Sequence, residues 1–164
     1  MTELESLKVR ELLKMHADIN TELRRREILR SANGPSGDYA ELLFARAFRW
    51  KLQSKSASGF DAMDESGTRY QIKCRRLTPQ NRSRQLSFMR RLDTRPYDVL
   101  AAVLLNEDFR VMRAALIPVE VVVEAAKFVA SVNGWRFILR DAVWSIPEVR
   151  DVTDELKAAE STIG

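Results

Sequence analysis

The sequence predicts an α/β fold in which helices flank a mixed central sheet and a helical extension precedes it. Three observations carry this prediction: helical spacing of apolar residues over 3–30, polar and apolar alternation over a hairpin at 59–74, and two strand-length apolar runs at 97–105 and 109–117. A chain of 164 residues with 45% hydrophobic and 30% charged residues is typical of one globular domain.

The predicted extension occupies residues 1–33, and the predicted core occupies residues 36–150. The apolar face of the extension is formed by Leu4, Leu7, Leu12, Met15, Ile19 and Leu23. This face needs a partner, which is either the core sheet or a second copy of the chain in a homodimer. We expect the helix to pack on the sheet. The run Arg24-Arg25-Arg26 near its end could contact phosphate or could face solvent.

The turn-rich stretch 31–37 predicts a linker, and a new helix is expected to start at Asp38. The hairpin follows it. Residues 65–67 suit a three-residue loop in which Gly67 adopts the left-handed conformation. In that register Asp61 lies opposite Gln71. Because side chains alternate along a strand, Gln71 and Lys73 share one face while Tyr70, Ile72 and Cys74 pack inward on the other.

The rest of the chain supplies the remaining elements. The runs 97–105 and 109–117 predict a central hairpin with a turn at 106–108. Pro118 suits the first turn of a helix that continues to Val129 and ends at Asn133-Gly134. A short strand is expected at 135–139, and a polar helix at the carboxyl terminus.

Asp61, Gln71 and Lys73 form the clearest chemical pattern in the chain. An acid, an amide oxygen and an ammonium on one face of a hairpin could hold a divalent cation on oxygen ligands beside a fixed positive charge. Each residue also has a simpler interpretation. Asp61 could be a turn residue, and Gln71 and Lys73 could form a solvated strand face. Glu41 could merely lie in the first turn of a helix, where the dipole favours acids.

Over residues 36–117 the sequence resembles the PD-(D/E)XK nuclease superfamily, also called restriction-endonuclease-like. The matching segments are Gly59-Phe60-Asp61, Gln71-Ile72-Lys73 and a helix at 37–48 that carries Glu41. The resemblance implies a restriction-endonuclease-like mixed sheet and a Mg²⁺-dependent endodeoxyribonuclease in which Mn²⁺ can substitute. It also implies that Asp61, Gln71 and Glu41 hold the metal and that Lys73 completes the catalytic set.

One residue departs from the pattern of this family. The second motif usually carries Asp or Glu where this chain has Gln71, although some subfamilies have Gln. An amide coordinates a hard cation through its oxygen but contributes no charge. We therefore expect weaker metal binding unless Glu41 compensates.

A basic block spans residues 69–95. It contains nine basic residues and one acid, Asp93: Arg69, Lys73, Arg75, Arg76, Arg82, Arg84, Arg90, Arg91 and Arg95. Interleaved apolar residues favour an ordered segment over a disordered one. Arginine forks match phosphate geometry, which favours a nucleic-acid backbone as the partner. The expected contacts are Arg75, Arg76, Arg82, Arg84, Arg90 and Arg91.

Composition argues against several other classes of protein. Cys74 is the only cysteine and His16 the only histidine, so an internal disulfide, a histidine-based zinc site and a Ser-His-Asp triad have little support. The acidic amino terminus has no signal-peptide pattern, and the apolar runs are too short to span a bilayer. We expect a cytoplasmic protein without a membrane partner.

The sequence therefore predicts a hydrolase that cleaves phosphodiester bonds, most readily those of DNA, with Mg²⁺. Two alternatives stay open. One is a catalytically weak or inactive nuclease-fold protein that binds DNA, which the uncharged Gln71 would permit. The other is a structural or interaction protein in which the amino-terminal helix makes the contacts.

Overall fold

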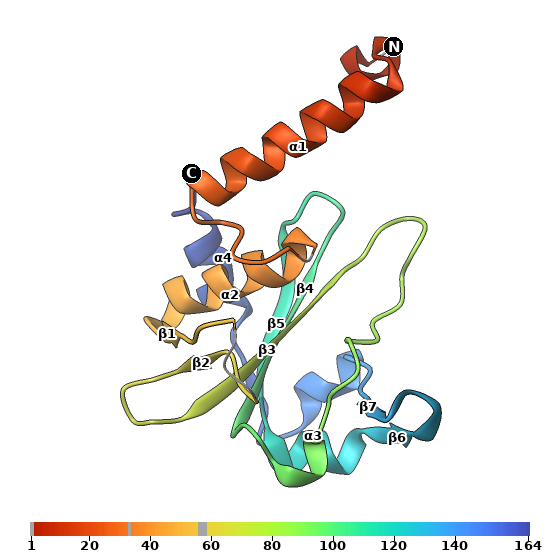
Figure 1. The fold of residues 1–164 in the computed structure, drawn as a ribbon. Coiled ribbons are helices and arrows are strands. Elements are labelled where there is room, and N and C mark those ends of the chain that lie inside the picture. The colour runs from red at the N-terminus through yellow and green to blue at the C-terminus, as the bar shows by residue number, and fades with distance from the viewer. Residues whose placement is uncertain (1, 33, 56–58) are drawn as a thin grey trace.

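The computed structural model describes residues 2–32, 34–55 and 59–164 (Figure 1). The helices are α1 (Val9–Arg25), α2 (Pro35–Phe48), α3 (Val119–Ala125) and α4 (Thr153–Glu160). The strands are β1 (Lys51–Leu52), β2 (Ala62–Met63), β3 (Arg69–Arg76), β4 (Val99–Leu105), β5 (Val111–Pro118), β6 (Lys127–Val129), β7 (Gly134–Arg136) and β8 (Arg150–Asp151). Short 3-10 turns occupy Glu3–Ser6, Leu92–Thr94, Ala130–Val132 and Asp141–Ser145.

Six of these strands form one mixed sheet in the order β1-β2-β3-β4-β5-β8. Only β3 and β4 run parallel, and the other neighbouring strands are antiparallel. β4 is apolar along its whole length because helices or loops cover both of its sides. The prediction of a mixed sheet flanked by helices is confirmed at this level, as is the central hairpin of β4 and β5.

Each face of the sheet has its own core. α2 and α4 cover one face, where Phe44 and Leu156 pack with Val103 (Figure 1). α4 lies beyond residue 150, where the core was expected to end, yet Leu156 is fully buried. The other face is covered by α3 and by the crossover at residues 77–98 that joins β3 to β4, with Leu86 and Tyr97 buried there. The candidate residues of β3 lie beneath this crossover.

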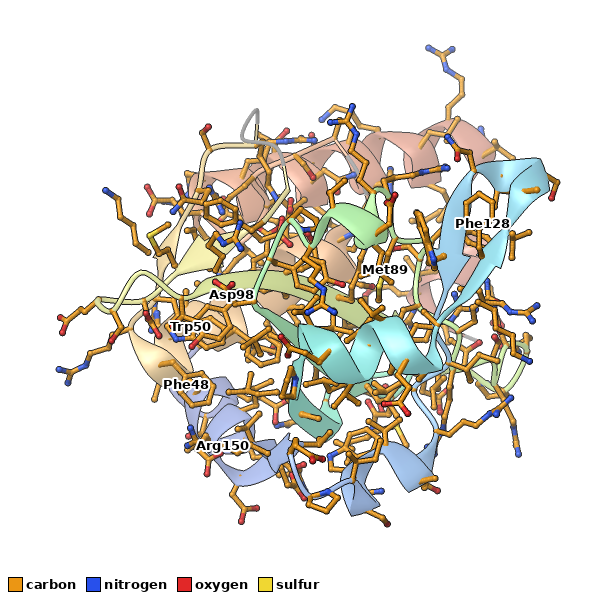
Figure 2. All side chains as sticks on the ribbon, turned by 90° about the horizontal axis from the view of Figure 1, so that it is seen from below. Phe48, Trp50, Met89, Asp98, Phe128 and Arg150 are labelled. Atoms are coloured by element: carbon orange, nitrogen blue, oxygen red, sulfur yellow. The ribbon has the colours of Figure 1, made fainter. Side chains whose placement is uncertain are left out.

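An aromatic stack fixes the strands before β3. The ring of Trp50 lies 3.6 Å from that of Tyr70 and 5.0 Å from that of Phe48, measured between centroids. The guanidinium of Arg150 lies 5.6 Å from the centroid of Phe48. Figure 2 shows Phe48, Trp50 and Arg150 grouped on one side of the molecule. The stack ties α2 and β1 to β3, and so sets the position of the helix that carries Glu41.

The β2–β3 hairpin forms as the sequence predicts. The Gly67 amide donates to the Asp64 carbonyl at 3.1 Å, and Gly67 has a φ of 82°. Residues 65–67 therefore form the expected loop, with glycine where other residues would be strained. On β3, Tyr70 and Ile72 pack into the core beneath α2, whereas Gln71 and Lys73 face the opposite side.

The structure corrects the expected position of the amino-terminal helix. α1 forms, but none of its residues is buried, and it projects away from the sheet (Figure 1). Val9 is 72% exposed and Leu13 is 65% exposed. The expectation that this helix packs on the sheet is wrong, because α2 and α4 already cover the adjacent sheet face. Among the described residues, no helix combines the length and apolarity that a bilayer crossing requires.

Two helix boundaries also differ from the prediction. α2 begins at Pro35 rather than Asp38, because proline suits the first helical position. α3 ends at Ala125 rather than Val129, and 127–129 instead form β6, which pairs with β7. Asn133, with a φ of 48°, therefore lies in the connection between two strands rather than at the end of α3. β7 pairs in turn with the crossover through Met89 and Trp135, and helical spacing over 118–129 carries no sign of that contact between residues far apart in sequence.

Candidate functional site

Asp61 lies one residue before β2, directly against β3. Continuing the pairing of Ala62 with Tyr70 places Asp61 opposite Gln71, as predicted. Its Oδ2 accepts hydrogen bonds from the Ile72 amide at 2.7 Å and from Gln71 Nε2 at 2.8 Å. Both of these hydrogen bonds reach the same oxygen of the carboxylate. Burial raises the pKa of Asp61, although the Ile72 amide and Lys73 oppose that rise.

Lys73 lies on the same face of β3 as Gln71, two residues further along the strand. Its Nζ donates to Ser87 Oγ on the crossover at 2.8 Å. Burial lowers the pKa of the Lys73 ammonium and the charge of Arg90 lowers it further, whereas Asp61 acts in the opposite direction. A lysine whose pKa is lowered towards neutrality is better suited to exchange a proton than an ordinary surface lysine.

Glu41 reaches the same neighbourhood from α2. Its side chain is nearly buried, and burial raises its pKa, with a further contribution from the negative charge of Asp61. Lys55 and Arg30, which contact Glu41, also lower the pKa of Asp61, so the two acids share basic neighbours. The role of Glu41 as a third metal ligand stays a prediction.

Two basic residues that sequence reasoning did not select hold Glu41. Lys55 Nζ lies 2.7 Å from Glu41 Oε2 and 2.8 Å from Oε1, and Arg30 NH1 lies 3.1 Å from Oε2. Lys55 also contacts Asp38 at 2.8 Å, so its ammonium bridges the two acids of α2. Lys55 is an isolated lysine after a short strand, and nothing in the local sequence distinguishes it. Only the fold reveals its role.

Asp38 itself has a structural role. Its Oδ2 accepts hydrogen bonds from the amides of Arg30 and Ser31, both at 2.8 Å. Burial raises the pKa of Asp38, but the hydrogen bonds from Lys55, Arg30 and Ser31 outweigh burial and leave the pKa below its usual value. Asp38 thus ties the segment before α2 to the helix, and it orients the Lys55 ammonium that faces Glu41.

The oxygen donors of these residues suit a hard cation that is coordinated partly by the protein and partly by the substrate. In the described part of the chain, no three His, Cys, Asp or Glu residues gather as a ready-made metal site. Asp61, Glu41 and the amide of Gln71 supply oxygen donors. Mg²⁺ is commonly held in proteins by one or two carboxylates, with water and substrate phosphate completing its coordination. These residues fit that mode, provided that Lys55 releases Glu41 and that the Gln71 amide turns its oxygen towards the cation.

A cleft of about 550 Å³ opens over the polar face of β3. Gln71 and Lys73 form part of its floor, and the crossover supplies Phe88 and Met89. Three arginines line it: Arg69, Arg90 and Arg91. Arg69 is ion-paired with Asp98 at 3.0 Å, whereas Arg91 is exposed. The cleft therefore combines two of the candidate residues, Gln71 and Lys73, with positive charge. Asp61 and Glu41 are not among its lining residues, and Asp61 connects to it through the hydrogen bond with Gln71.

The basic block is split between two places in the fold. Of the six arginines expected to contact nucleic acid, Arg90 and Arg91 line the cleft. The others lie towards the far end of β3. Arg75 donates to the Ser83 carbonyl at 2.9 Å, and Arg76 to the Glu107 carbonyl at 3.0 Å. Arg82 and Arg84 line a separate hollow, where Arg84 also pairs with Asp141 at 2.6 Å.

Comparison of the sequence with profiles of known protein families and with curated proteins found no match. The chemistry assigned to this site therefore depends on its residues and their geometry. Those residues are Asp61, Gln71 and Lys73 on the hairpin, with Glu41 and Lys55 beside them.

Proposed function

We propose that this protein hydrolyses phosphodiester bonds in DNA with the help of Mg²⁺, for which Mn²⁺ can substitute. The observation that carries the proposal is a cleft lined by Gln71, Lys73 and three arginines, with Asp61 hydrogen-bonded to Gln71 beside it. The order of helix, hairpin and parallel strand in the mixed sheet supports it. The resemblance of the sequence motifs to the PD-(D/E)XK nucleases supports it as well.

Each residue has a distinct role in this proposal. Asp61 Oδ1, the Gln71 amide oxygen and, once freed, Glu41 hold the cation, which supplies Lewis-acid polarisation of a phosphate oxygen. Lys73 orients the attacking water and offsets the negative charge that develops on the phosphate. Water adds to phosphorus, the P–O bond to the leaving oxygen breaks, and that oxygen takes up a proton. Arg90 and Arg91 seat the strand beside these groups.

A direct assay tests this proposal. The purified protein is incubated with plasmid, linear duplex and single-stranded DNA, and with RNA, in the presence of Mg²⁺, Mn²⁺ or EDTA. We expect cleavage of DNA with either metal and none in EDTA. Cleavage that persists in EDTA, or no cleavage of any substrate with either metal, would contradict the proposal.

The alternative of a protein that binds DNA without cutting it is favoured by a specific observation. Gln71 brings no charge, and the Lys55 ammonium already occupies both oxygens of Glu41. If Lys55 never releases Glu41, Asp61 is the only carboxylate left for the cation. Such a protein binds DNA equally well in EDTA and with Mg²⁺.

The alternative of a structural or interaction protein is favoured by the exposed apolar face of α1. If α1 makes the functional contacts, charge reversal at Arg90 and Arg91 leaves function intact.

Substitution of Gln71 by Glu is expected to raise metal affinity. The new carboxylate replaces an amide whose nitrogen lies 2.8 Å from Asp61 Oδ2, so two like charges meet unless a cation lies between them. We expect about tenfold tighter Mn²⁺ binding, or about 1.4 kcal/mol. We also expect a larger rise in melting temperature on adding metal than wild type shows.

Calorimetric titration and thermal unfolding with and without Mn²⁺ measure both effects. Gln85→Glu is the matched control, because Gln85 lies on the crossover and bridges to Ile138 outside the cleft. It should leave metal affinity unchanged. Equal affinities of Gln71→Glu and wild type would place residue 71 outside the coordination sphere.

The two parts of the basic block should differ in their effect on DNA binding. Arg91 is exposed in the cleft, whereas the charge of Arg84 is offset by Asp141. Loss of one phosphate contact reduces the slope of log affinity against log salt by about 0.9 on duplex DNA and about 0.7 on single strands. We expect this reduction for Arg91→Ala and almost none for Arg84→Ala.

Fluorescence anisotropy over a range of salt concentrations, with Ca²⁺ in place of Mg²⁺ to discourage cleavage, measures the slope. The affinity loss of Arg91→Ala should be similar for different DNA sequences, because phosphate contacts carry no base information. A smaller slope for Arg84→Ala than for Arg91→Ala would move the DNA path to the far end of β3.

A further inference from the structure

The β6–β7 hairpin carries an aromatic pair in which Trp135 is half-buried against the core and Phe128 is exposed. Phe128 on β6 lies across from Trp135 on β7, with ring centroids 4.8 Å apart and ring planes inclined by 56°. Phe128 is 52% exposed. Figure 2 shows it at the edge of the molecule, on the hairpin, with Met89 nearer the centre. We call Phe128 and Trp135 the aromatic platform.

The platform is held firmly against the crossover. Met89 and Trp135 exchange two backbone hydrogen bonds, each of 2.9 Å. A Cβ at Gly134 would lie 3.2 Å from Phe88 Cβ and 3.3 Å from the Met89 carbonyl, so a larger residue there would push the crossover slightly away from the hairpin. Arg90 donates to the Asn133 carbonyl at 2.8 Å. The hairpin is therefore fixed to the segment that also walls the cleft.

The platform and the cleft share walls. Arg90, Arg91 and Thr94 line the cleft that contains Lys73, and the same three residues line a neighbouring hollow that contains Phe128 and Trp135. An extended ligand that enters the cleft beside Lys73 can therefore continue past Arg90 and Arg91 to the aromatic rings. Arginines next to an exposed aromatic ring match a ligand with alternating phosphates and flat bases.

We propose that the aromatic platform stacks an unpaired base close to the cleaved phosphodiester, so that the substrate contains single-stranded DNA. This inference rests on the proposed nuclease function for the position of the cleaved bond. In a duplex each base is stacked on both faces, and none offers a free face to Phe128. An unpaired base has a free face, and stacking on an aromatic side chain tolerates every base. Arg90 and Arg91 bind the phosphates on either side.

Binding measurements on the intact protein test this inference. Fluorescence anisotropy is recorded for a labelled single strand of about twelve nucleotides, and for its duplex, with Ca²⁺ in place of Mg²⁺. We expect Phe128→Ala to bind the single strand roughly five- to 150-fold more weakly while its duplex affinity stays unchanged. Phe128→Tyr keeps the ring and should bind the single strand as wild type does.

Met112→Ala is the matched control, because Met112 is 42% exposed and lines neither the cleft nor the hollow beside the platform. It should bind both DNA forms as wild type does. An unchanged single-strand affinity for Phe128→Ala, or equal losses on both DNA forms, overturns the inference.

Cleavage assays separate the two proposals. A protein that cleaves DNA but shows no dependence on Phe128 retains the nuclease function and loses the platform. If the protein never cleaves DNA but Phe128→Ala loses affinity only for the single strand, the platform is retained and the nuclease function is contradicted.

Discussion

Asp61→Asn is expected to lose metal-dependent cleavage by more than about a hundredfold while its fold remains intact. A bound cation contributes several kcal/mol to transition-state stabilisation, and about 3 kcal/mol already corresponds to that factor. Asparagine keeps an oxygen that can accept the Ile72 amide now bonded to Asp61 Oδ2 at 2.7 Å. The substitution therefore removes the charge and preserves the local backbone contact. Plasmid cleavage with Mg²⁺ measures the rate, and calorimetry measures metal affinity.

Asp154→Asn is the matched control for this experiment, because Asp154 is an exposed acid on α4, which packs on the opposite face of the sheet. It should cleave at the rate of wild type. Circular dichroism and thermal unfolding check that both variants are folded. A wild-type cleavage rate in folded Asp61→Asn would show that the hairpin acid is not a metal ligand.

Lys73→Met is expected to separate metal binding from cleavage. Methionine is unbranched and of similar length, but it removes the ammonium that contacts Ser87. An ammonium donates hydrogen bonds and cannot coordinate a cation, so metal affinity should be retained. Cleavage should fall by about 10²- to 10³-fold, the usual loss when one group that stabilises developing negative charge is removed. Rates with saturating Mn²⁺, together with calorimetric titration, measure the two quantities separately.

Lys157→Met on α4 provides the control, because Lys157 is exposed on the helix that packs on the opposite face of the sheet. Its cleavage rate and metal affinity should equal those of wild type. If Lys73→Met loses metal affinity in parallel with cleavage, Lys73 acts by arranging the ligands rather than on the attacking water.

The contrast between Lys73 and Lys55 explains how the candidate site depends on the fold. Both lysines lie beside a candidate metal-binding acid, but Lys55 neutralises Glu41 while Lys73 faces the cleft. Entry of a cation at Glu41 must overcome the ion pair with Lys55. A charged pair that is mostly buried is costly to break, because each separated charge loses its partner away from water.

The fold also decides which arginines of the basic block are already ion-paired. Its composition indicated an anionic partner, but composition cannot tell which arginines already have partners. Arg84 pairs with Asp141 and Arg95 with Glu120, both distant in sequence. Because an ion pair offsets the charge of its arginine, only the arginines that remain exposed near Lys73 are expected to dominate contact with phosphate.

The sequence by itself determined the parts of this protein that depend on local chemistry. The alternation along β3 placed Gln71 and Lys73 on one face, and Gly67 specified the hairpin loop that sets Asp61 opposite Gln71. These features follow from the two-residue period of a strand and from the left-handed conformation that glycine tolerates. The amphipathic pattern likewise predicted a helix at α1, because helical spacing is local.

Tertiary structure alone decided what these elements face. It left the apolar side of α1 exposed, turned residues 127–129 from predicted helix into a strand opposite Trp135, and brought Lys55 to Glu41. It also joined the platform to the cleft through Arg90 and Arg91. The β6–β7 pairing itself is local, but the hairpin is held by the contact between Trp135 and Met89, and this contact, like the other outcomes, joins segments far apart in the chain. Such contacts form only when the whole core packs, so no local pattern in the sequence encodes them.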